Sequence, residues 1–304
     1  MKYVVIGAGG TGGILGAALC KAGCDVTLIA RGEHLKKIKE NGLIVRQLTD
    51  RSEESIPICA MTEADFQGTA DVVFVCVKGY SVESILPFLD RITTAESVII
   101  PVLNIFTTGE TLRAALPGKY AVDGCIYVSA NIDEPGVLLQ HVKILRVIYG
   151  AAQGQEKRAI LQAVKEELKG SEIRLVLSDH IRRDAMKKFC YVSPIGAAGL
   201  YYNATAGDFQ EEGEKRELFV GLMREVEALA DKMGCPFDGD VIGSNLNILD
   251  HQPPEATTSL QRDVYAGKQS EIKGLILDIP ALGEQLGLDL PLYRKVAEKY
   301  RQTG

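Results

Sequence analysis

The chain has 304 residues, a formal net charge of −6 at pH 7 and a hydrophobic fraction of 46%. This length allows two domains of roughly 150 residues, each with its own core. An acidic chain lacks the general attraction to nucleic acids and anionic membrane surfaces that basic proteins have. The composition therefore argues against either as a partner.

The cysteine and histidine patterns give no sign of disulfides or metal ligands. The seven cysteines lie mostly in apolar stretches without a CxxC pair, as reduced cytoplasmic thiols do. His34, His141, His180 and His251 are too far apart for a metal motif, so we expect no metal. The uncharged stretch 3–20 superficially resembles a secretory signal. Its glycines and β-branched start do not suit a continuous helix, so we expect a cytoplasmic protein.

The first half of the chain alternates apolar runs with helical segments. Four runs rich in valine and isoleucine have the composition of parallel strands buried on both faces: residues 2–6, 24–30, 71–77 and 97–103. Helical spacing follows at 81–93 and 109–116, and residues 119–150 add strand-like segments. We expect an open α/β sheet in this half.

A glycine pattern between the first strand and the first helix indicates a nucleotide site. Gly7, Gly9 and Gly12 form GxGxxG within a βαβ unit. Gly7 would permit a tight turn, Gly9 a close approach to a pyrophosphate, and Gly12 close packing of helix and strand. The start of the helix, including Gly10 and Thr11, would offer amide donors and the helix dipole to the phosphates.

The end of the second strand indicates which dinucleotide binds. An NAD-binding domain is expected to place Asp or Glu there, whereas this chain has Ala30 and Arg31. A guanidinium is permanently charged and can pair with a ribose phosphate through two hydrogen bonds. We therefore expect NADPH as the cofactor. The alternative is that Arg31 is a solvated residue before a helix at 33–40.

Helical periodicity dominates after residue 178. Residues 183–206 are nearly apolar apart from Lys187 and Lys188, which predicts a long buried helix bent at Pro194. Residues 215–233 carry apolar side chains at helical spacing, and this apolar stripe is interpreted as a packing face of a helix and not as a functional site. Further helices are expected at 257–267, 271–286 and 291–301.

These patterns predict two domains of different class. Residues 1–177 should form a Rossmann-type, NADP-binding α/β domain, and residues 178–304 an all-α substrate and catalytic domain. The buried helices of the second domain could face their own core or a partner chain, which leaves a homodimer open.

Several blocks of sequence resemble the ketopantoate reductase family along nearly the whole chain. They occur in the family's order: GAGGTG, the strand-end Arg31, VKGYSVESIL, LNIFTTGE, AMKKF and TTSLQRDVYAGKQSEI. The last two are more particular than the glycine pattern, which many dehydrogenases share. The resemblance implies NADPH-dependent reduction of a small 2-oxo acid. Its best substrate would be 2-dehydropantoate (ketopantoate), in pantothenate biosynthesis.

In AMKKF, Lys188 matches the family's catalytic lysine. Hydride addition to a ketone creates an alkoxide, so a nearby ammonium would stabilise the charge and supply the proton. Two adjacent lysines cannot share a helix face, and the motif favours Lys188 over Lys187. The alternative is a lysine that extends from a helix end into solvent.

The resemblance gives roles to four further residues. Ser259 would help to hold the substrate carboxylate, and Glu271 would be a catalytic-site residue in the interdomain cleft near substrate and nicotinamide. Without the resemblance, Ser259 is a helix-start residue and Glu271 a first-turn acid that complements the helix dipole. Lys78 and Asn104 follow buried strands, at the sheet edge where ligands bind, and would lie beside nicotinamide and substrate. Without the resemblance, Lys78 and Asn104 are turn residues that only terminate apolar strands.

The chain departs from the family's pattern where substrate hydroxyls would bind. Val192 and Gly196 stand where the family usually has asparagines, and Met186 and Ile105 replace its usual tryptophan and glycine. A site that hydrogen-bonds a hydroxyl discriminates strongly, and an apolar site cannot do so in the same way. A same-fold dehydrogenase for another 2-oxo or hydroxy acid, and a non-catalytic NADPH-sensing protein, are therefore the alternatives.

Overall fold

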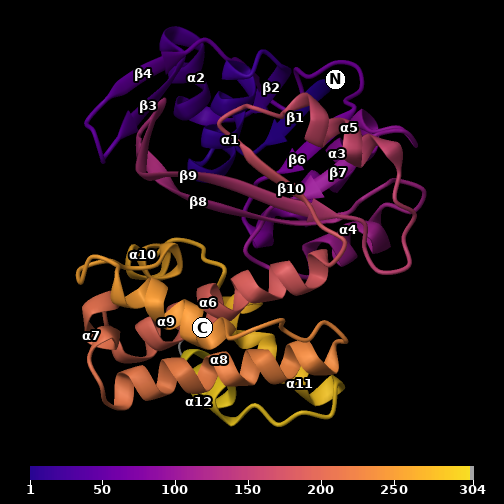
Figure 1. Cartoon of the computed structure of the whole chain (residues 1–304). Coiled ribbons are helices and arrows are strands. Elements are labelled where there is room, and N and C mark those ends of the chain that lie inside the picture. The colour runs from indigo at the N-terminus through magenta and orange to yellow at the C-terminus, as the bar shows by residue number, and fades with distance from the viewer. Residues whose placement is uncertain (302–304) are drawn as a thin grey trace. The chain divides into compact units, whose positions relative to one another are not determined.

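The computed structural model describes residues 1–301. The chain divides into two compact units, Met1–Ile181 and Arg182 to the C-terminal end, each described by itself below. The first unit is of the α/β class and the second is helical (Figure 1), as the sequence predicts.

A parallel sheet in the order β5-β2-β1-β6-β7 forms the centre of the first unit. Its strands are β1 (Lys2–Ile6), β2 (Asp25–Ile29), β5 (Cys59–Met61), β6 (Val72–Val75) and β7 (Val98–Pro101). The four strands expected from apolar runs are confirmed, whereas β5 was not expected. Both faces of the sheet are covered, which explains why β1, β6 and β7 are almost continuously apolar.

Helices cover the two faces of this sheet. They are α1 (Gly10–Lys21), α2 (Gly32–Asn41), α3 (Leu86–Ile92), α4 (Thr108–Ala115) and α5 (Ala159–Glu167), with short 3-10 turns at η1 (Gly79–Ser81) and η2 (Glu83–Ile85). On one face, α1 packs Leu15 and Leu19 into a core shared with the sheet. On the other, Leu89 of α3 and Leu112 of α4 pack against the alternate strand residues.

The first unit also contains a second sheet, whereas the sequence predicted one open sheet. Its strands are β3 (Leu43–Gln47), β4 (Glu53–Ile56), β8 (Asp123–Glu134), β9 (Val137–Gly150) and β10 (Arg174–Leu177), in the order β10-β9-β3-β4 with β8 paired to β9. β8 and β9 form a long antiparallel hairpin that turns next to Gly136, with φ of 84°. β4 is mostly exposed and polar, so it lacks the apolar run that revealed the buried strands.

The second unit contains helices and no strand between residues 182 and 301 (Figure 1). They are α6 (Ile181–Tyr202), α7 (Ala206–Gln210), α8 (Glu214–Lys232), α9 (Val241–Asp250), α10 (Ser259–Tyr265), the π-helical η3 (Lys273–Leu277), α11 (Ile279–Gln285) and α12 (Pro291–Arg301). The stripe on α8 is buried, so its interpretation as packing is confirmed. The expected helix at 271–286 is divided into η3 and α11, and α7 and α9 were not expected.

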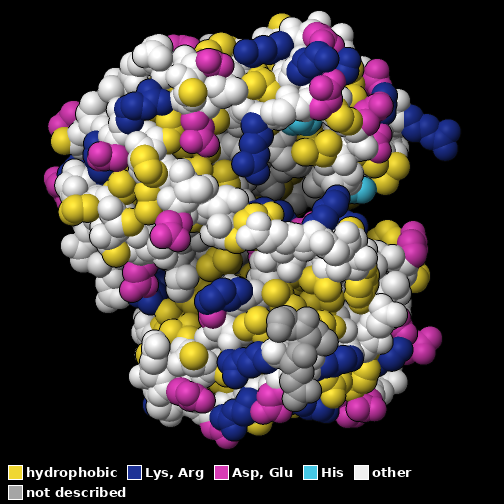
Figure 2. Space-filling model, turned by 180° about the vertical axis from the view of Figure 1, so that it is seen from behind, with side chains coloured by type: hydrophobic (Ala, Val, Ile, Leu, Met, Phe, Trp, Pro, Cys, Tyr) yellow, Lys and Arg dark blue, Asp and Glu magenta, His cyan; other side chains and the backbone are white. Residues whose placement is uncertain are grey.

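Two properties of the described part of the chain bear on partners. Within residues 1–301, no helix has the length and apolar character needed to cross a membrane. On the face seen in Figure 2, lysine and arginine side chains are interspersed with aspartate and glutamate. This mixture is unlike the clustered basic surface that marks many nucleic-acid-binding proteins.

Candidate functional site

Four of the predicted cofactor positions follow neighbouring strands of the parallel sheet. The glycine turn follows β1, Arg31 follows β2, Lys78 follows β6, and Asn104 lies between β7 and α4. Because these strands are parallel, their carboxyl ends share one edge. The chain leaves β1 for β2 on one side, and β6 lies on the other, so the glycine turn occupies the switch point where nucleotides bind in such sheets.

The glycine turn contains two positions that tolerate no side chain and one that has free space. Gly7 has φ of 102°, and a Cβ there would lie 3.0 Å from the Cys76 carbonyl oxygen. A Cβ on Gly12 would lie 1.9 Å from the Gly7 oxygen, which reflects close packing of α1 on β1. A Cβ on Gly9 would meet nothing within 4 Å. Gly9 thus faces open space in which a ligand can approach the backbone.

The start of α1 is arranged to accept an anion. Gly9 is its N-cap, no side chain caps the helix, and its first turn carries no acidic residue. The amides of this turn, including that of Thr11, lack intrahelical acceptors by the geometry of any α-helix. Gly10 has a separate structural reason to be glycine: a Cβ would lie 2.2 Å from the Ala130 oxygen of β8. No sequence pattern indicates this contact, because the hairpin is distant in the chain.

Arg31 is exposed, with extended backbone, as the N-cap of α2. Within residues 1–301 no carboxylate forms an ion pair with it. A surface arginine usually gains little from an ion pair. Without such a pair, the guanidinium is available to a phosphate.

In the second unit, α6 gives its two adjacent lysines different surroundings. Lys187 forms an ion pair with Asp238, which also contacts Arg183 at 3.1 Å. The Lys187 ammonium holds the pKa of the Asp238 carboxyl below its usual range. Lys188 is buried, with 9% of its surface exposed. Lys187 is thus paired with Asp238 near the surface, and Lys188 is buried.

Glu271 is also buried, with 6% exposed, and it begins a helical turn: its carbonyl oxygen accepts from the Leu275 amide at 3.0 Å. The π-helical η3 follows. In a continuing π-helix the amide of residue 280 would donate to Leu275, but Pro280 has no N–H. The Ser193 hydroxyl supplies a donor instead, at 2.5 Å from the Leu275 oxygen.

Tyr293 completes this buried network. Its hydroxyl lies 2.5 Å from Ser193 Oγ, and because the serine proton is directed to Leu275, Tyr293 donates to Ser193. Burial raises the pKa of Tyr293 well above its ordinary value, which keeps the donor protonated. The turn that follows Glu271 is thus held by a hydrogen bond from Ser193 of α6, which in turn accepts from Tyr293 of α12. Sequence reasoning missed both hydroxyls, since neither belongs to a motif.

Ser259 is the exposed first residue of α10, but it is not the cap. Thr258 caps the helix through a reciprocal pair of bonds with Gln261, whose side-chain amide also donates to the Ala204 carbonyl at 2.7 Å. The interpretation of Ser259 as a helix-start residue holds for its position only, since Thr258 performs the capping. The Ser259 hydroxyl is therefore not needed to cap α10.

The two positions that lack the family's asparagines lie along α6 from Lys188. Val192 follows it by one helical turn and is half-buried. Gly196 follows by a second turn, where an added Cβ would lie 3.1 Å from Leu260 of α10. Close packing of α10 therefore fills the space that a longer side chain at Gly196 would need.

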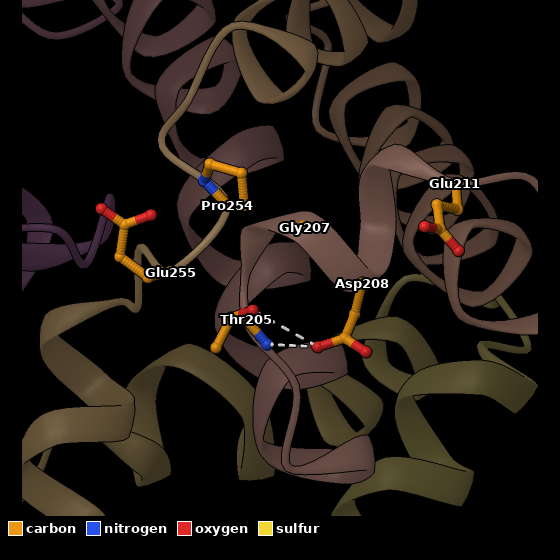
Figure 3. Close-up of a pocket in the computed structure, with 6 residues that line it drawn as sticks. All are labelled: Thr205, Gly207, Asp208, Glu211, Pro254 and Glu255. Carbon is orange, nitrogen blue, oxygen red and sulfur yellow. Dashed lines mark hydrogen bonds between the residues drawn. The ribbon is translucent and has the colours of Figure 1, made fainter.

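A pocket in the second unit contains none of the predicted residues. It has a volume of about 450 Å³ and is lined by Thr205, Gly207, Asp208, Glu211, Pro254 and Glu255 (Figure 3). Asp208 is engaged in capping, because its carboxylate accepts from the Thr205 amide at 2.9 Å. Glu211 lies apart from Thr205, Pro254 and Glu255 in Figure 3. Within residues 1–301, no group of acidic, histidine or cysteine side chains is arranged to hold a metal.

Comparison with known proteins identifies the family. Residues 3–154 match the family Ketopantoate reductase PanE/ApbA, and residues 180–303 match its C-terminal counterpart, Ketopantoate reductase PanE/ApbA C terminal. The 2-dehydropantoate 2-reductase of Mesorhizobium japonicum is 27% identical, with 96% of this chain and 94% of that protein covered. The uncharacterized oxidoreductase YkpB of Bacillus subtilis is 26% identical, with 89% and 88% covered.

Among solved structures, a ternary complex of D-mandelate dehydrogenase with NADH and anilino(oxo)acetate has a TM-score of 0.86 at 18% identity, with 98% of this chain and 96% of that chain covered. At this identity the likeness concerns the fold alone. The family matches, by contrast, extend over both units and include the glycine turn, AMKKF and the α10 block. The chain belongs to the ketopantoate reductase family.

Proposed function

We propose that the protein is an NADPH-dependent reductase of a small 2-oxo acid, with 2-dehydropantoate as the best candidate substrate. The observation that carries this proposal is Lys188, a buried cation on the helix that matches the family, next to a lysine already paired with Asp238. Buried ionisable side chains are enriched at functional sites, which supports a role for Lys188 in the chemistry.

The residues of the first unit fit a bound dinucleotide. Gly9 leaves open space, the start of α1 is uncapped, and Arg31 forms no ion pair with another described residue. When bound, NADPH supplies the hydride. Lys78 and Asn104, at the carboxyl edge of the same sheet, are proposed to orient the nicotinamide and the substrate.

The side chains of the second unit supply the remaining chemistry. Hydride addition converts the ketone oxygen to an alkoxide, whose charge the Lys188 ammonium would stabilise before donating a proton to it. Ser259 would hold the substrate carboxylate with its hydroxyl. Glu271 would accept hydrogen bonds from the substrate or from Lys188 and so fix their orientation.

Arg31 should determine cofactor preference. Arg31→Ala is expected to raise the KM for NADPH by roughly 10- to 100-fold, as loss of charge-assisted bonds to a phosphate does, while the KM for NADH changes little. Steady-state kinetics with both cofactors measures the difference. Arg31→Lys serves as the control that keeps the charge, and it should lose less. An equal rise in the KM for both cofactors would show that Arg31 does not bind the ribose phosphate.

The proposed reaction is tested by a screen of 2-oxo acids with NADPH and NADH, followed by the absorbance of the reduced nicotinamide. We expect consumption of NADPH with 2-dehydropantoate. Tight NADPH binding without reduction of any 2-oxo acid would instead favour the sensing protein. A homodimer and a cytoplasmic location stay predictions of the sequence.

The apolar surface along α6 favours a second candidate, the reduction of a 2-oxo acid that carries no hydroxyl. Val192 cannot hydrogen-bond a substrate, and Leu260 packs against Gly196. The D-mandelate dehydrogenase of the same fold, crystallised with anilino(oxo)acetate, provides a precedent for an apolar substituent. A higher kcat/KM for 3-methyl-2-oxobutanoate than for 2-dehydropantoate in the same screen would select this candidate.

A further inference from the structure

His34 connects three segments around the nucleotide turn. It lies on α2, one helical turn after Arg31, and is partly buried. Its Nε2 is 2.9 Å from the carbonyl oxygen of Ala8, the residue between Gly7 and Gly9. Its Nδ1 is 2.9 Å from the amide nitrogen of Gly136, at the turn of the β8–β9 hairpin. One imidazole therefore bridges α2, the glycine turn and the second sheet.

These two contacts determine the protonation state of the ring. The Gly136 N–H can only donate, so Nδ1 accepts and carries no proton. The Ala8 oxygen can only accept, so Nε2 carries the proton and donates. A second proton would place an N–H of Nδ1 against the N–H of Gly136. Burial lowers the pKa of His34, which acts in the same direction.

The bond to Ala8 has a consequence for the next amide. The peptide group that joins Ala8 to Gly9 is planar and trans, so its C=O and N–H point in opposite directions. Fixing the Ala8 oxygen toward α2 therefore fixes the Gly9 N–H on the opposite side. No acceptor in residues 1–301 takes that hydrogen. It belongs to the same residue whose missing Cβ leaves open space.

We infer that His34 is a positioning residue for the dinucleotide: through Ala8 it directs the Gly9 amide toward the pyrophosphate and ties the glycine turn to the helix that begins at Arg31. The inference rests on the proposed binding of NADPH at this turn. A pyrophosphate is common to NADPH and NADH, so His34 should affect both cofactors equally. Arg31 should affect only the phosphorylated one.

Two substitutions separate the bonds of the ring. His34→Asn keeps an acceptor near the Nδ1 position for Gly136 but is too short to reach Ala8. His34→Gln is one carbon longer, so its side-chain N–H can lie near the Nε2 position and keep the donor to Ala8. We expect His34→Asn to raise the Kd of NADPH and of NADH alike, by roughly 10-fold or more, as the loss of a well-aimed bond to a charged group does. His34→Gln should restore most of the affinity.

The measurement is a fluorescence titration of both dinucleotides, with thermal unfolding in parallel. Tyr149→Phe is the matched control, because it removes another buried side-chain bond of the first unit, from Tyr149 to the Leu161 oxygen at 2.6 Å, away from the turn. It should lower Tm without changing the Kd.

A wild-type Kd in His34→Asn, or an equal rise in Kd in Tyr149→Phe, would overturn the inference. So would a loss in His34→Gln as large as that in His34→Asn, since the donor to Ala8 would then be irrelevant. If the wild-type protein binds neither dinucleotide, the proposed function itself fails and this inference fails with it.

Discussion

Lys188→Ala should lower kcat for 2-oxo acid reduction by about 10²- to 10⁴-fold, the usual contribution of a positioned general acid, while the Kd of NADPH stays within about twofold. The reason is that the alkoxide would lose both its stabilising charge and its proton donor, whereas the dinucleotide is proposed to bind in the first unit. Steady-state kinetics and NADPH titration measure the two quantities separately.

Lys187→Ala is the matched control for this experiment. It also removes one lysine from α6, but that lysine is paired with Asp238 near the surface. Such pairs contribute at most about 1 kcal/mol, so activity should be close to that of the wild type. Turnover of Lys188→Ala within a few-fold of wild type would exclude this residue as the acid. A larger loss of activity in Lys187→Ala than in Lys188→Ala would instead assign the role of proton donor to Lys187.

Alanine at Gly12 should destabilise the fold, whereas alanine at Gly9 should impair only the binding of NADPH. Gly12→Ala places a methyl 1.9 Å from the Gly7 oxygen, a backbone atom that cannot move aside without opening the turn. We expect a loss of stability of about 3 kcal/mol or more, because α1 must shift away from β1. Thermal or urea unfolding would measure it, and NADPH binding should be lost with the turn.

Gly9→Ala should leave the fold intact and weaken only the binding of NADPH. Its Cβ would meet nothing within 4 Å, and the φ of −69° is one that alanine adopts readily. The added methyl would occupy the space proposed for the pyrophosphate, so the Kd of NADPH should rise by roughly 10-fold or more at an unchanged Tm. Wild-type affinity in Gly9→Ala would show that no phosphate approaches this part of the turn.

The sequence predicts those parts of the molecule that depend on local pattern. The strands β1, β2, β6 and β7 lie within apolar runs, and the helix α1 begins within the glycine pattern, at Gly10. This reasoning misses β4 of the second sheet because it is polar, and it misses β5 at the edge of the parallel sheet because that strand has only three residues. Nothing in their composition distinguishes such strands from loops.

The environment of the candidate residues depends on segments far away in the chain. Asp238, which neutralises Lys187, lies 51 residues further along. The Ser193 hydroxyl meets Leu275 and Tyr293, 82 and 100 residues away. Sequence pattern names Lys188 and Glu271 as candidates, but only the fold reveals that Lys187 is paired with Asp238 and what holds the turn after the glutamate.

The wide turn at η3 affects how sequences of the family should be compared. A π-helical turn contains one residue more than an α-helical turn closed at the same point, and each residue advances a helix by about 100°. If a regular α-helix continued back from α11, the residue after Glu271 would occupy the position from which Glu271 now projects. The extra residue of the π-helical turn therefore moves Glu271 to that side of the segment. A relative without this extra residue would need its acid at a shifted alignment column to present the same carboxylate.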